Sequence, residues 1–565
     1  MTAGFELQSS GQAYIVGFIK NEGKAIAIAG AGLYNELGAT NPEMYYSGTL
    51  FGYREGEMKP YADLPYSTAE HDGEGRIIIT FNTAASHERA AYEQLRVGDV
   101  VSCRAQGVYA AVKTNASSGI VYEDLTAYAA SGGVGFAEYE TVGVVYHRVV
   151  DTSQPGKLIP KEIYDKYKAL EAQYGISFDV YTDGEHYRGC PMRIGSVDGL
   201  HCINTVKGSQ VTSSIFENMA DDGTNQHGGY SRLSYIKNND DGTATVCFKG
   251  NLTQVGYNKS AGPYTPNSWG RFPDKGNEVF IYSLGNGEVL CDGVALTKWE
   301  ADGTRTTAEW GTEVCCYTFT VAADTVDWAL YQSFVDRGVM DDPDDRISRV
   351  NMPDETYKVA VENSTYMCDG GYFDNCLVQN TRSRGFLIKA SNVTIENCTF
   401  RYMAAAISVR NEGGWGEASY SRNLVIKNNL IDHTGYRGDA PTNSPITIVG
   451  VGAESSLDLP LDKLLTGDIL IEGNVIRNRC AKYAVNLQGV ENVRVINNDF
   501  GKKNTVEGLS LQRACLHIEQ VKNVTVEGNT YPDATMMPRM TVTANRYIGL
   551  GGADLGNAFP DSPTK

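Results

Sequence analysis

Three aspartates have the types and the spacing that could carry acid–base chemistry. Asp198 opens a segment Asp-Gly-Leu-His, and the pair Asp221 and Asp222 follows further along the chain, ahead of Gly223. The interval between the two motifs is close to one turn of a β-solenoid, in which equivalent side chains of adjacent turns lie roughly 4.8 Å apart. Carboxylates packed so closely repel one another, so one pKa rises while another group stays ionised. Hydrolysis of a glycosidic bond needs that division between an acid and a base.

Other interpretations of the same residues compete with this one. Asp-Gly and Asp-Asp-Gly are ordinary turn sequences on a solvated surface, although the one-coil spacing of the two elements disfavours that view. An acidic calcium site is a third interpretation. Because no set of His, Cys and carboxylate residues with ligand spacing accompanies the aspartates, we expect neither a metal nor a cofactor.

Repeats in the C-terminal third reveal the element that would position these side chains. Five segments align, each with alternating apolar residues, an Asn or Gly turn and a further apolar residue: 392–400, 423–431, 468–476, 492–500 and 523–531. Their unequal spacing indicates a coil of about 24 residues with loops added at particular turns. Asn at these turns tolerates αL geometry and can stack on the Asn of the next coil.

The same period extends the solenoid to the front of the chain. A second strand per coil is visible at 406–409, 446–449 and 484–487, and matching motifs at 119–122 and 143–146 are one coil apart. Between 229 and 350 the repeat gives way to strands of a different rhythm. We therefore predict an all-β fold, a right-handed parallel β-helix (solenoid) with an inserted small β-barrel-like domain.

The predicted organisation has four parts. They are the N-terminal part of the β-helix with a less regular start (1–228), the inserted β-domain (229–350), the C-terminal part of the β-helix (351–550) and a tail (551–565). A helix is expected over 160–174, with Pro160 in its first turn and Gly175 after its end, as a loop excursion from one coil.

The composition of the chain limits the classes of partner that it is expected to bind. The formal net charge is −19, the sequence pI is near 5.0 and no Lys/Arg run stands out, so a nucleic-acid partner is not expected. No apolar run reaches transmembrane length, so neither is a membrane. The 12 cysteines contain no C-x-x-C pair, which indicates small buried residues rather than a zinc ribbon. We expect a secreted or periplasmic protein whose signal peptide is not part of this chain, and a homodimer is compatible with the sequence.

Two longer stretches carry a more specific resemblance. The first comprises Ile194-Gly-Ser-Val-Asp-Gly-Leu-His201, then Lys207-Gly208, then 215–228; the second comprises 381–389, 392–400 and Gly414-Trp-Gly-Glu417 ahead of 422–429. Together they resemble the β-helical α-1,3-galactosidases of glycoside hydrolase family 110, which act on blood-group-B-type glycans. The resemblance covers residues 115 to 530 with the insertion in the same place, and departs at Thr224, Gln226, Gly416 and the helix near 165.

The resemblance implies an exo-acting hydrolase that releases terminal α-linked galactose, preferably α-1,3-linked, from an oligosaccharide or glycoprotein glycan. It implies catalysis by Asp198, Asp221 and Asp222 with inversion. Polygalacturonase-like β-helix enzymes share an Asp, then Asp-Asp arrangement, and by that analogy Asp221 is the acid while the other two hold water. Coil stacking at roughly 4.8 Å would favour retention. Inversion is still expected, because carboxylates at a bend splay apart and no fourth carboxylate is evident as a nucleophile.

Seven further residues are candidates for substrate binding: His201, Lys207, Asn225, His227, Arg384, Trp415 and Glu417. The histidines could bond sugar hydroxyls, Trp415 could stack on a sugar face with Arg384 and Glu417 contacting hydroxyls, and Lys207 could brace a carboxylate. Each has an alternative role in packing or in holding a neighbour in place.

Three alternative functions stay open. One is an exo-glycosidase of the same fold acting on another terminal sugar. Another is a polysaccharide lyase, which the acidic centre disfavours because it would repel a uronate. The third is a non-enzymatic glycan-binding β-helix such as an adhesin or a tailspike, which would not need three stacked aspartates.

Overall fold

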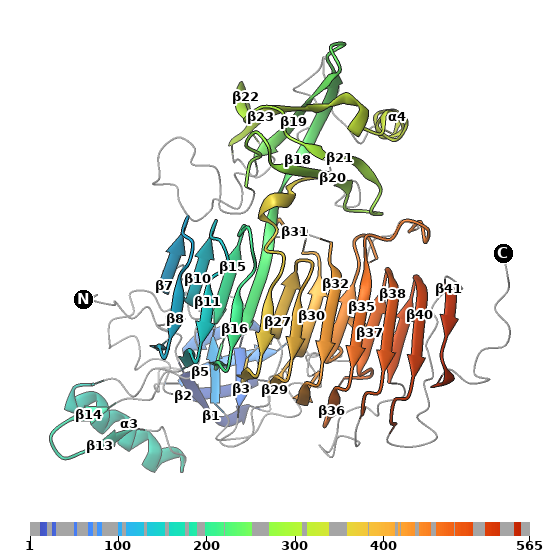
Figure 1. Ribbon diagram of the computed structural model, residues 1–565. Helices are drawn as coiled ribbons and strands as arrows, with labels where there is room; N and C mark the ends of the chain where they lie inside the picture. Colours follow the sequence, from blue (N-terminus) through green and yellow to red (C-terminus); the bar gives the residue numbers. More distant parts are fainter. Residues whose placement is uncertain are drawn as a thin grey trace.

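The computed structural model consists mainly of β-strands stacked along one axis (Figure 1). The residues it describes are 12–19, 25–29, 50–53, 66–71, 76–81, 100–103, 109–128, 133–152, 158–175, 180–188, 198–219, 221–250, 271–307, 313–337, 359–381, 383–412, 416–418, 420–435, 440–453, 459–479, 481–500, 515–531 and 547–554. Within these ranges, no helix combines the length and the apolar character needed to cross a membrane.

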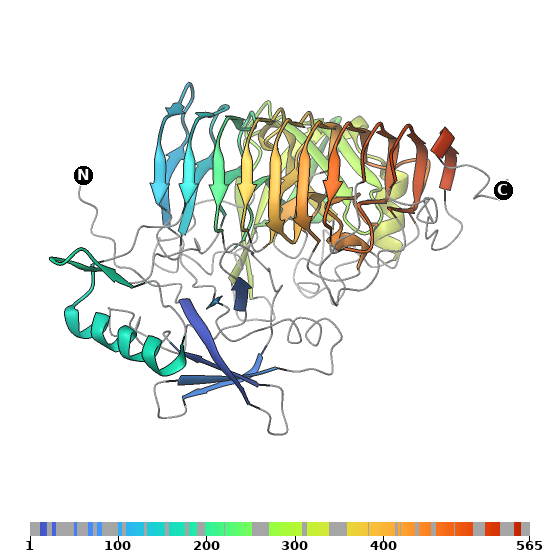
Figure 2. The same ribbon diagram turned by 90° about the horizontal axis from the view of Figure 1, so that it is seen from below.

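Three sheets of parallel strands form the faces of the solenoid (Figures 1 and 2). The first contains β7 (Tyr109–Asn115), β10 (Gly133–Tyr139), β15 (Leu200–Ile203), β18 (Thr224–Asn238), β27 (Arg384–Lys389), β30 (Ala405–Arg410), β34 (Ile446–Val449), β37 (Val485–Gln488) and β39 (Leu516–Glu519). The second contains β8 (Val121–Glu123), β11 (Val145–His147), β16 (Gln210–Thr212), β25 (Tyr372–Asp374), β28 (Thr394–Glu396), β32 (Arg422–Lys427), β35 (Thr466–Glu472), β38 (Val490–Ile496), β40 (Val521–Glu527) and β41 (Tyr547–Gly551). The third contains β9 (Thr126–Tyr128), β12 (Val150–Thr152), β17 (Ile215–Glu217), β26 (Leu377–Gln379), β29 (Thr399–Met403), β33 (Leu430–Thr434) and β36 (Val475–Arg477).

This pairing confirms the predicted all-β parallel β-helix. Val121 pairs with Val145 and Ile446 with Val485, as the repeats predicted. Alternate residues point inward, so Phe373, Phe386 and Phe400 meet inside the coils. Cysteines at eight positions are buried, as expected of small apolar residues: 202, 247, 291, 316, 368, 376, 398 and 515.

Asparagine performs both tasks predicted for it at the turns. Asn397, Asn428 and Asn497 adopt left-handed backbone conformations with φ near 55° (55°, 56° and 56°). A separate column of amides joins successive coils through side-chain hydrogen bonds; its members are the buried Asn429, Asn474 and Asn498 and the half-buried Asn529. Each amide also bonds a backbone N–H and a carbonyl oxygen of the preceding coil, as Asn474 does with Asn429 and Ile426.

The inserted domain grows directly out of a coil strand. The first part of β18 pairs in parallel with β15 and β27, whereas its later part pairs antiparallel with β19 (Thr243–Gly250) and β24 (Val359–Asn363). Other elements of the insert are β20 (Glu278–Ser283), β21 (Val289–Val294), β22 (Glu300–Thr307), β23 (Glu313–Ala322), η3 (Ala323–Thr325) and α4 (Trp328–Asp336). Apolar side chains such as Val246, Phe248 and Phe319 form a core of its own.

Two predicted boundaries need correction. The prediction joined the first hundred residues to the β-helix, but β1 (Gln12–Ile19), β2 (Ala25–Ala29), β3 (Leu50–Tyr53), β4 (Tyr66–His71), β5 (Arg76–Phe81) and β6 (Val100–Cys103) form a separate antiparallel sheet beside the coils (Figure 2). The insert was expected to end at residue 350, but β24 still belongs to it, because β24 pairs antiparallel with β18 and β20. Most of the predicted tail lies outside the described residues.

The excursion between β12 and β15 contains the predicted helix, here α3 (Lys161–Tyr174), which ends at Gly175 with φ 69°. It is followed by the hairpin β13 (Tyr181–Thr182) and β14 (Tyr187–Arg188). Shorter elements elsewhere are β31 (Glu417–Ala418), η5 (Ser364–Tyr366) and η7 (Pro441–Asn443).

Candidate active site

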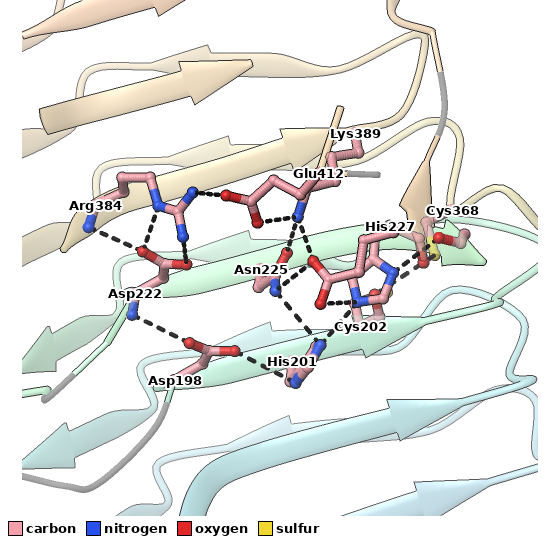
Figure 3. A network of polar contacts seen from close by, with 12 residues as sticks. Asp198, His201, Cys202, Asp222, Asn225, His227, Cys368, Arg384, Lys389 and Glu412 are labelled. Atoms are coloured by element: carbon pink, nitrogen blue, oxygen red, sulfur yellow. Dashed lines mark hydrogen bonds and ion pairs between the residues drawn. The ribbon is translucent and has the colours of Figure 1, made fainter. Parts of the chain in front are cut away.

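The strand register brings charged residues from successive coils into one column. Because β15, β18 and β27 pair in parallel, Asp198, Asp222 and Arg384 occupy equivalent positions just ahead of, or at the start of, these strands (Figure 3). The backbone N–H of Asp222 donates to Oδ1 of Asp198 at 3.1 Å. Asp221, the preceding residue, is half-buried and belongs to the same group.

The three aspartates lie together. One carboxylate oxygen of each lies within 4.8 Å of the others, and Asp198 and Asp222 are only 3% and 1% exposed. Burial, followed by the negative charges of Asp222 and Asp221, raises the pKa of Asp198 well above its ordinary value. Asp198 therefore retains a proton more readily than Asp222, whose rise in pKa a guanidinium opposes.

Asp222, in contrast to Asp198, is bonded to the guanidinium of Arg384. Its Nε donates to Oδ1 of Asp222 at 2.8 Å and its Nη2 to Oδ2 at 3.0 Å, while its backbone N–H also donates to Oδ1. Burial raises the pKa of Asp222, and the guanidinium opposes that shift. A carboxylate held by a two-pronged guanidinium is a stable anion, so Asp198 and Asp222 have environments that differ in the way an acid and a base require.

A second group of polar side chains lies on the outer surface of the same sheet (Figure 3). His201 on β15, Asn225 and His227 on β18 and Lys389 on β27 are all buried. Nε2 of His201 lies 2.8 Å from Nε2 of His227, and Lys389 donates to Oδ1 of Asn225 at 3.2 Å. The sheet thus has a continuous layer of polar side chains beside the aspartates, most of it buried.

Two glutamates reach this surface from the segment that contains β31. β31 pairs antiparallel with Gly228 and Gly229, and the carboxylates of Glu412 and Glu417 both contact Lys389. Glu412 also forms an ion pair with Arg384. Burial alone would raise the pKa of Glu417, but the Lys389 ammonium bonded to its carboxylate acts in the opposite direction. Both glutamates are therefore anions held by buried cations.

Lys389 and Glu412 were not among the predicted site residues. Lys389 is remote from His227 in the sequence, although the two are paired neighbours on adjacent coils, because the insert separates their strands. The sequence indicated no fourth carboxylate that could serve as a nucleophile. Glu412 and Glu417 lie in the same network as the aspartates, but both are paired with cations. In the sequence, only the Trp-Gly-Glu segment indicated that these two glutamates belong to the site.

Two predicted residues do not join the group as expected. Lys207 is exposed and lies at the corner after β15, on the far side of that strand from Asp198, so it cannot brace a carboxylate of the triad. Arg384 performs that task. Trp415 lies outside the described residues.

Two clusters have donors close enough to be considered for a metal. His201, His227 and Glu417 each offer an atom within 4.8 Å of the others, as do the three aspartates. Two nitrogens bound tetrahedrally to zinc at 2.0–2.1 Å lie about 3.4 Å apart. The 2.8 Å contact between the histidines is instead that of a hydrogen bond, and Lys389 already occupies Glu417. The donor geometry of the histidine pair therefore does not fit zinc.

Comparison with known proteins adds little to this picture. No family model and no curated protein matches the chain. Among solved structures, the chain is similar to the Gp54 tailspike of Acinetobacter baumannii bacteriophage AP22 in complex with A. baumannii capsular saccharide, with 10% identity and a TM-score of 0.20. The match covers 78% of this chain and 64% of the tailspike, less than two thirds of its length. The likeness is too distant to bear on function, and the fold rests on the strand pairing.

Proposed function

We propose that this chain is an exo-acting glycoside hydrolase that releases terminal α-linked galactose, preferably α-1,3-linked, with inversion. The observation that carries the proposal is the buried cluster of Asp198, Asp221 and Asp222, in which one carboxyl favours its protonated form and another is held as an anion. Glycoside hydrolysis uses such a pair. The resemblance of residues 115 to 530 to glycoside hydrolase family 110 supplies the choice of sugar.

The polar surface beside the triad supports a carbohydrate substrate. Asn225, Lys389 and Glu417 combine an amide, an ammonium and a carboxylate in fixed positions. Sugar hydroxyls both donate and accept hydrogen bonds, so a surface with donors and acceptors of both kinds suits them.

The stereochemical outcome has support on both sides. Nearest oxygens within 4.8 Å are closer than the roughly 6.5–9.5 Å carboxyl separation typical of inverting enzymes. Against retention, Asp222 has both oxygens bonded to Arg384, which makes it a weak nucleophile and favours its ionised form. A favoured proton on Asp198 makes that group a weak nucleophile too. We therefore propose inversion.

A panel of nitrophenyl α- and β-glycosides tests the proposal directly. We expect release of nitrophenol from the α-galactoside and of galactose from an α-1,3-linked digalactoside, and on the digalactoside a loss of several orders of magnitude in the Asp→Asn variants at 198, 221 and 222. Proton NMR of the first minutes should show β-galactose as first product. Ultraviolet absorbance of an unsaturated uronate would instead reveal a lyase, and saccharide binding without turnover would reveal a binding protein.

A further inference from the structure

A chain of hydrogen bonds leads away from Asp198 beneath the site (Figure 3). Oδ2 of Asp198 lies 3.3 Å from Nδ1 of His201, and Nε2 of His201 lies 2.8 Å from Nε2 of His227. Nδ1 of His227 lies 2.8 Å from the carbonyl oxygen of Gly228. All three side chains are buried, at most 7% exposed.

The carbonyl oxygen of Gly228, at the end of this chain of hydrogen bonds, determines where the ring hydrogens lie. A carbonyl oxygen only accepts, so Nδ1 of His227 carries a hydrogen. If His227 is neutral, its Nε2 accepts, and Nε2 of His201 must donate to it. A neutral His201 then has a bare Nδ1, so the hydrogen between it and Asp198 belongs to the carboxyl of Asp198.

A second arrangement with the same number of protons would make His227 an imidazolium and Asp198 a carboxylate. It would allow Asn225 to donate to Nε2 of His201, at 3.5 Å. However, it would place a cation in a fully buried ring close to Lys389, and the nearby carboxylate of Glu417, 3.8 Å from Nε2 of His227, already pairs with the Lys389 ammonium. Burial lowers the pKa of His227, and burial and His227 together lower that of His201 to about 3. The neutral arrangement is therefore favoured.

The other charges around Asp198 act in the same direction. Asp221 and Asp222 lie on the neighbouring coil, Glu417 approaches from β31 and Tyr139 approaches from β10. All of them either carry or can only acquire negative charge. Arg384 lies one coil beyond Asp222, at the start of β27, and its guanidinium is bonded to Asp222 and Glu412.

We propose that His201 and His227 are positioning residues that hold the proton on Asp198, and that Asp198, rather than Asp221, is the proton donor of the hydrolysis. The role of Asp198 as proton donor rests on the proposed function, whereas the role of the two histidines does not. When the glycosidic C–O bond breaks, the leaving oxygen takes the Asp198 proton, and the attacking water gives a proton to an ionised carboxylate. That proton later returns to Asp198 through solvent, so the count is conserved.

NMR of the protein carrying isotope-labelled histidine tests the first half without any substrate. We expect His201 to be neutral with hydrogen on Nε2, and His227 to be neutral with hydrogen on Nδ1, across neutral pH. His201→Gln and His227→Gln identify the signals by their loss. An imidazolium at His227 with hydrogen on Nδ1 of His201 overturns the proposal, as does a shift of both rings when zinc alone is added.

Leaving-group dependence tests the second half. Nitrophenolate departs with little protonation, whereas an alkoxide needs it, and general acid catalysis contributes about 10²–10⁴-fold. Asp198→Asn should therefore lose far more activity on methyl α-galactoside than on nitrophenyl α-galactoside, while Asp221→Asn should lose both equally. The reverse pattern would restore Asp221 as donor. An enzyme inactive on every galactoside would remove the proposed function and leave the NMR result standing.

The pH profile separates positioning from mere packing. His201→Phe removes the acceptor that favours protonated Asp198, so the alkaline limb of kcat/KM should move down by about 1 pH unit. His201→Gln, whose amide oxygen can accept, should restore much of the limb. His517→Phe is the matched control, because His517 is 3% exposed on the same sheet but lies on β39. An unshifted limb in folded His201→Phe contradicts the positioning role.

Discussion

Arg384 determines which charge the column of Asp198 and Asp222 can support. Its guanidinium neutralises Asp222 on one side and Glu412 on the other, so a single cation connects the triad to the polar surface of the sheet. Arginine is suited to this task because its planar group binds two carboxylates while staying charged when buried. Lysine in its place would keep the charge but lose the two-pronged contact with Asp222.

The variant Arg384→Met should shift the acid side of the pH profile. Asp222 must be ionised to accept a proton from water, and Arg384 opposes the rise in its pKa that burial causes. Without the guanidinium the pKa rises further, so the acid limb of kcat/KM should move to higher pH and turnover should fall by at least about 10²-fold. Arg422→Met, which removes ion pairs of β32 to Asp468 and Glu491, should leave the limb in place. An equal shift in both variants would contradict a direct effect on Asp222.

At the scale of elements, the buried asparagine column holds neighbouring coils in register. Nδ2 of Asn474 donates to the carbonyl oxygen of Ile426 and to Oδ1 of Asn498, and its Oδ1 accepts from Asn429. Each amide thus bonds backbone groups at the turn of the neighbouring coil. Asn492 and Asn523 form a similar but exposed pair outside the coils.

We therefore expect Asn474→Ala to lower the free energy of unfolding by about 3 kcal/mol, because several buried partners lose their bonds at once. Urea denaturation measures this change. Asn523→Gly keeps the left-handed backbone of its position, φ 55°, and removes only an exposed bond, so its loss should stay within about 1 kcal/mol. Similar losses in both variants would show that the buried column has no special role.

Local signals in the sequence were sufficient for the coils, for α3 and for the grouping of the aspartates. Asp198 and Asp222 are related by one uninterrupted coil, so their proximity follows from counting. Arg384 and Lys389 are separated from Asp222 by the insert and its return strand. The length of this segment does not follow the coil period, so their proximity could not be predicted by counting. The separate sheet of β1 to β6 was missed because antiparallel pairing leaves no repeat to detect.

For the molecule as a whole, two buried glutamates outside the site govern stability against pH. Glu138 on β10 accepts from Ser209 and Thr141, and burial raises its pKa to about 7. Glu362 on β24 accepts from Tyr282, and burial raises its pKa to about 8. Both pKa values exceed the pKa of a glutamate in an unfolded chain. Between the unfolded and the folded pKa, the folded protein therefore binds more protons than the unfolded protein.

Stability should consequently fall as the pH rises from about 4.5 to 8, by roughly 3–5 kcal/mol for each group at 1.36 kcal/mol per pKa unit. Urea denaturation across this range measures the slope. Glu138→Gln and Glu362→Gln should each flatten it, whereas Glu123→Gln, at an exposed surface position, should not. A wild-type slope of the opposite sign would mean that these carboxyls are ionised in the folded protein.

Removal of divalent cations gives a further test of the whole molecule. Prolonged chelation should leave both the turnover rate and the melting temperature unchanged, since Arg384 and Lys389 already balance the buried carboxylates. Melting curves and rates before and after dialysis against chelator provide the measurement. A loss that calcium restores would assign the aspartates to a cation site.

The continuity of β18 from coil to insert also has a consequence for synthesis. Asp198 and Asp222 are translated before the insert, and Arg384 follows Asp222 by 162 residues. At about 5–20 residues per second, the ribosome needs roughly 8–32 s to supply that arginine. During this interval the nascent coil has its acids but none of their guanidinium or ammonium partners. Until the returning strand supplies these cations, protons and small ions of the cell are the only counter-charges available to the carboxyls.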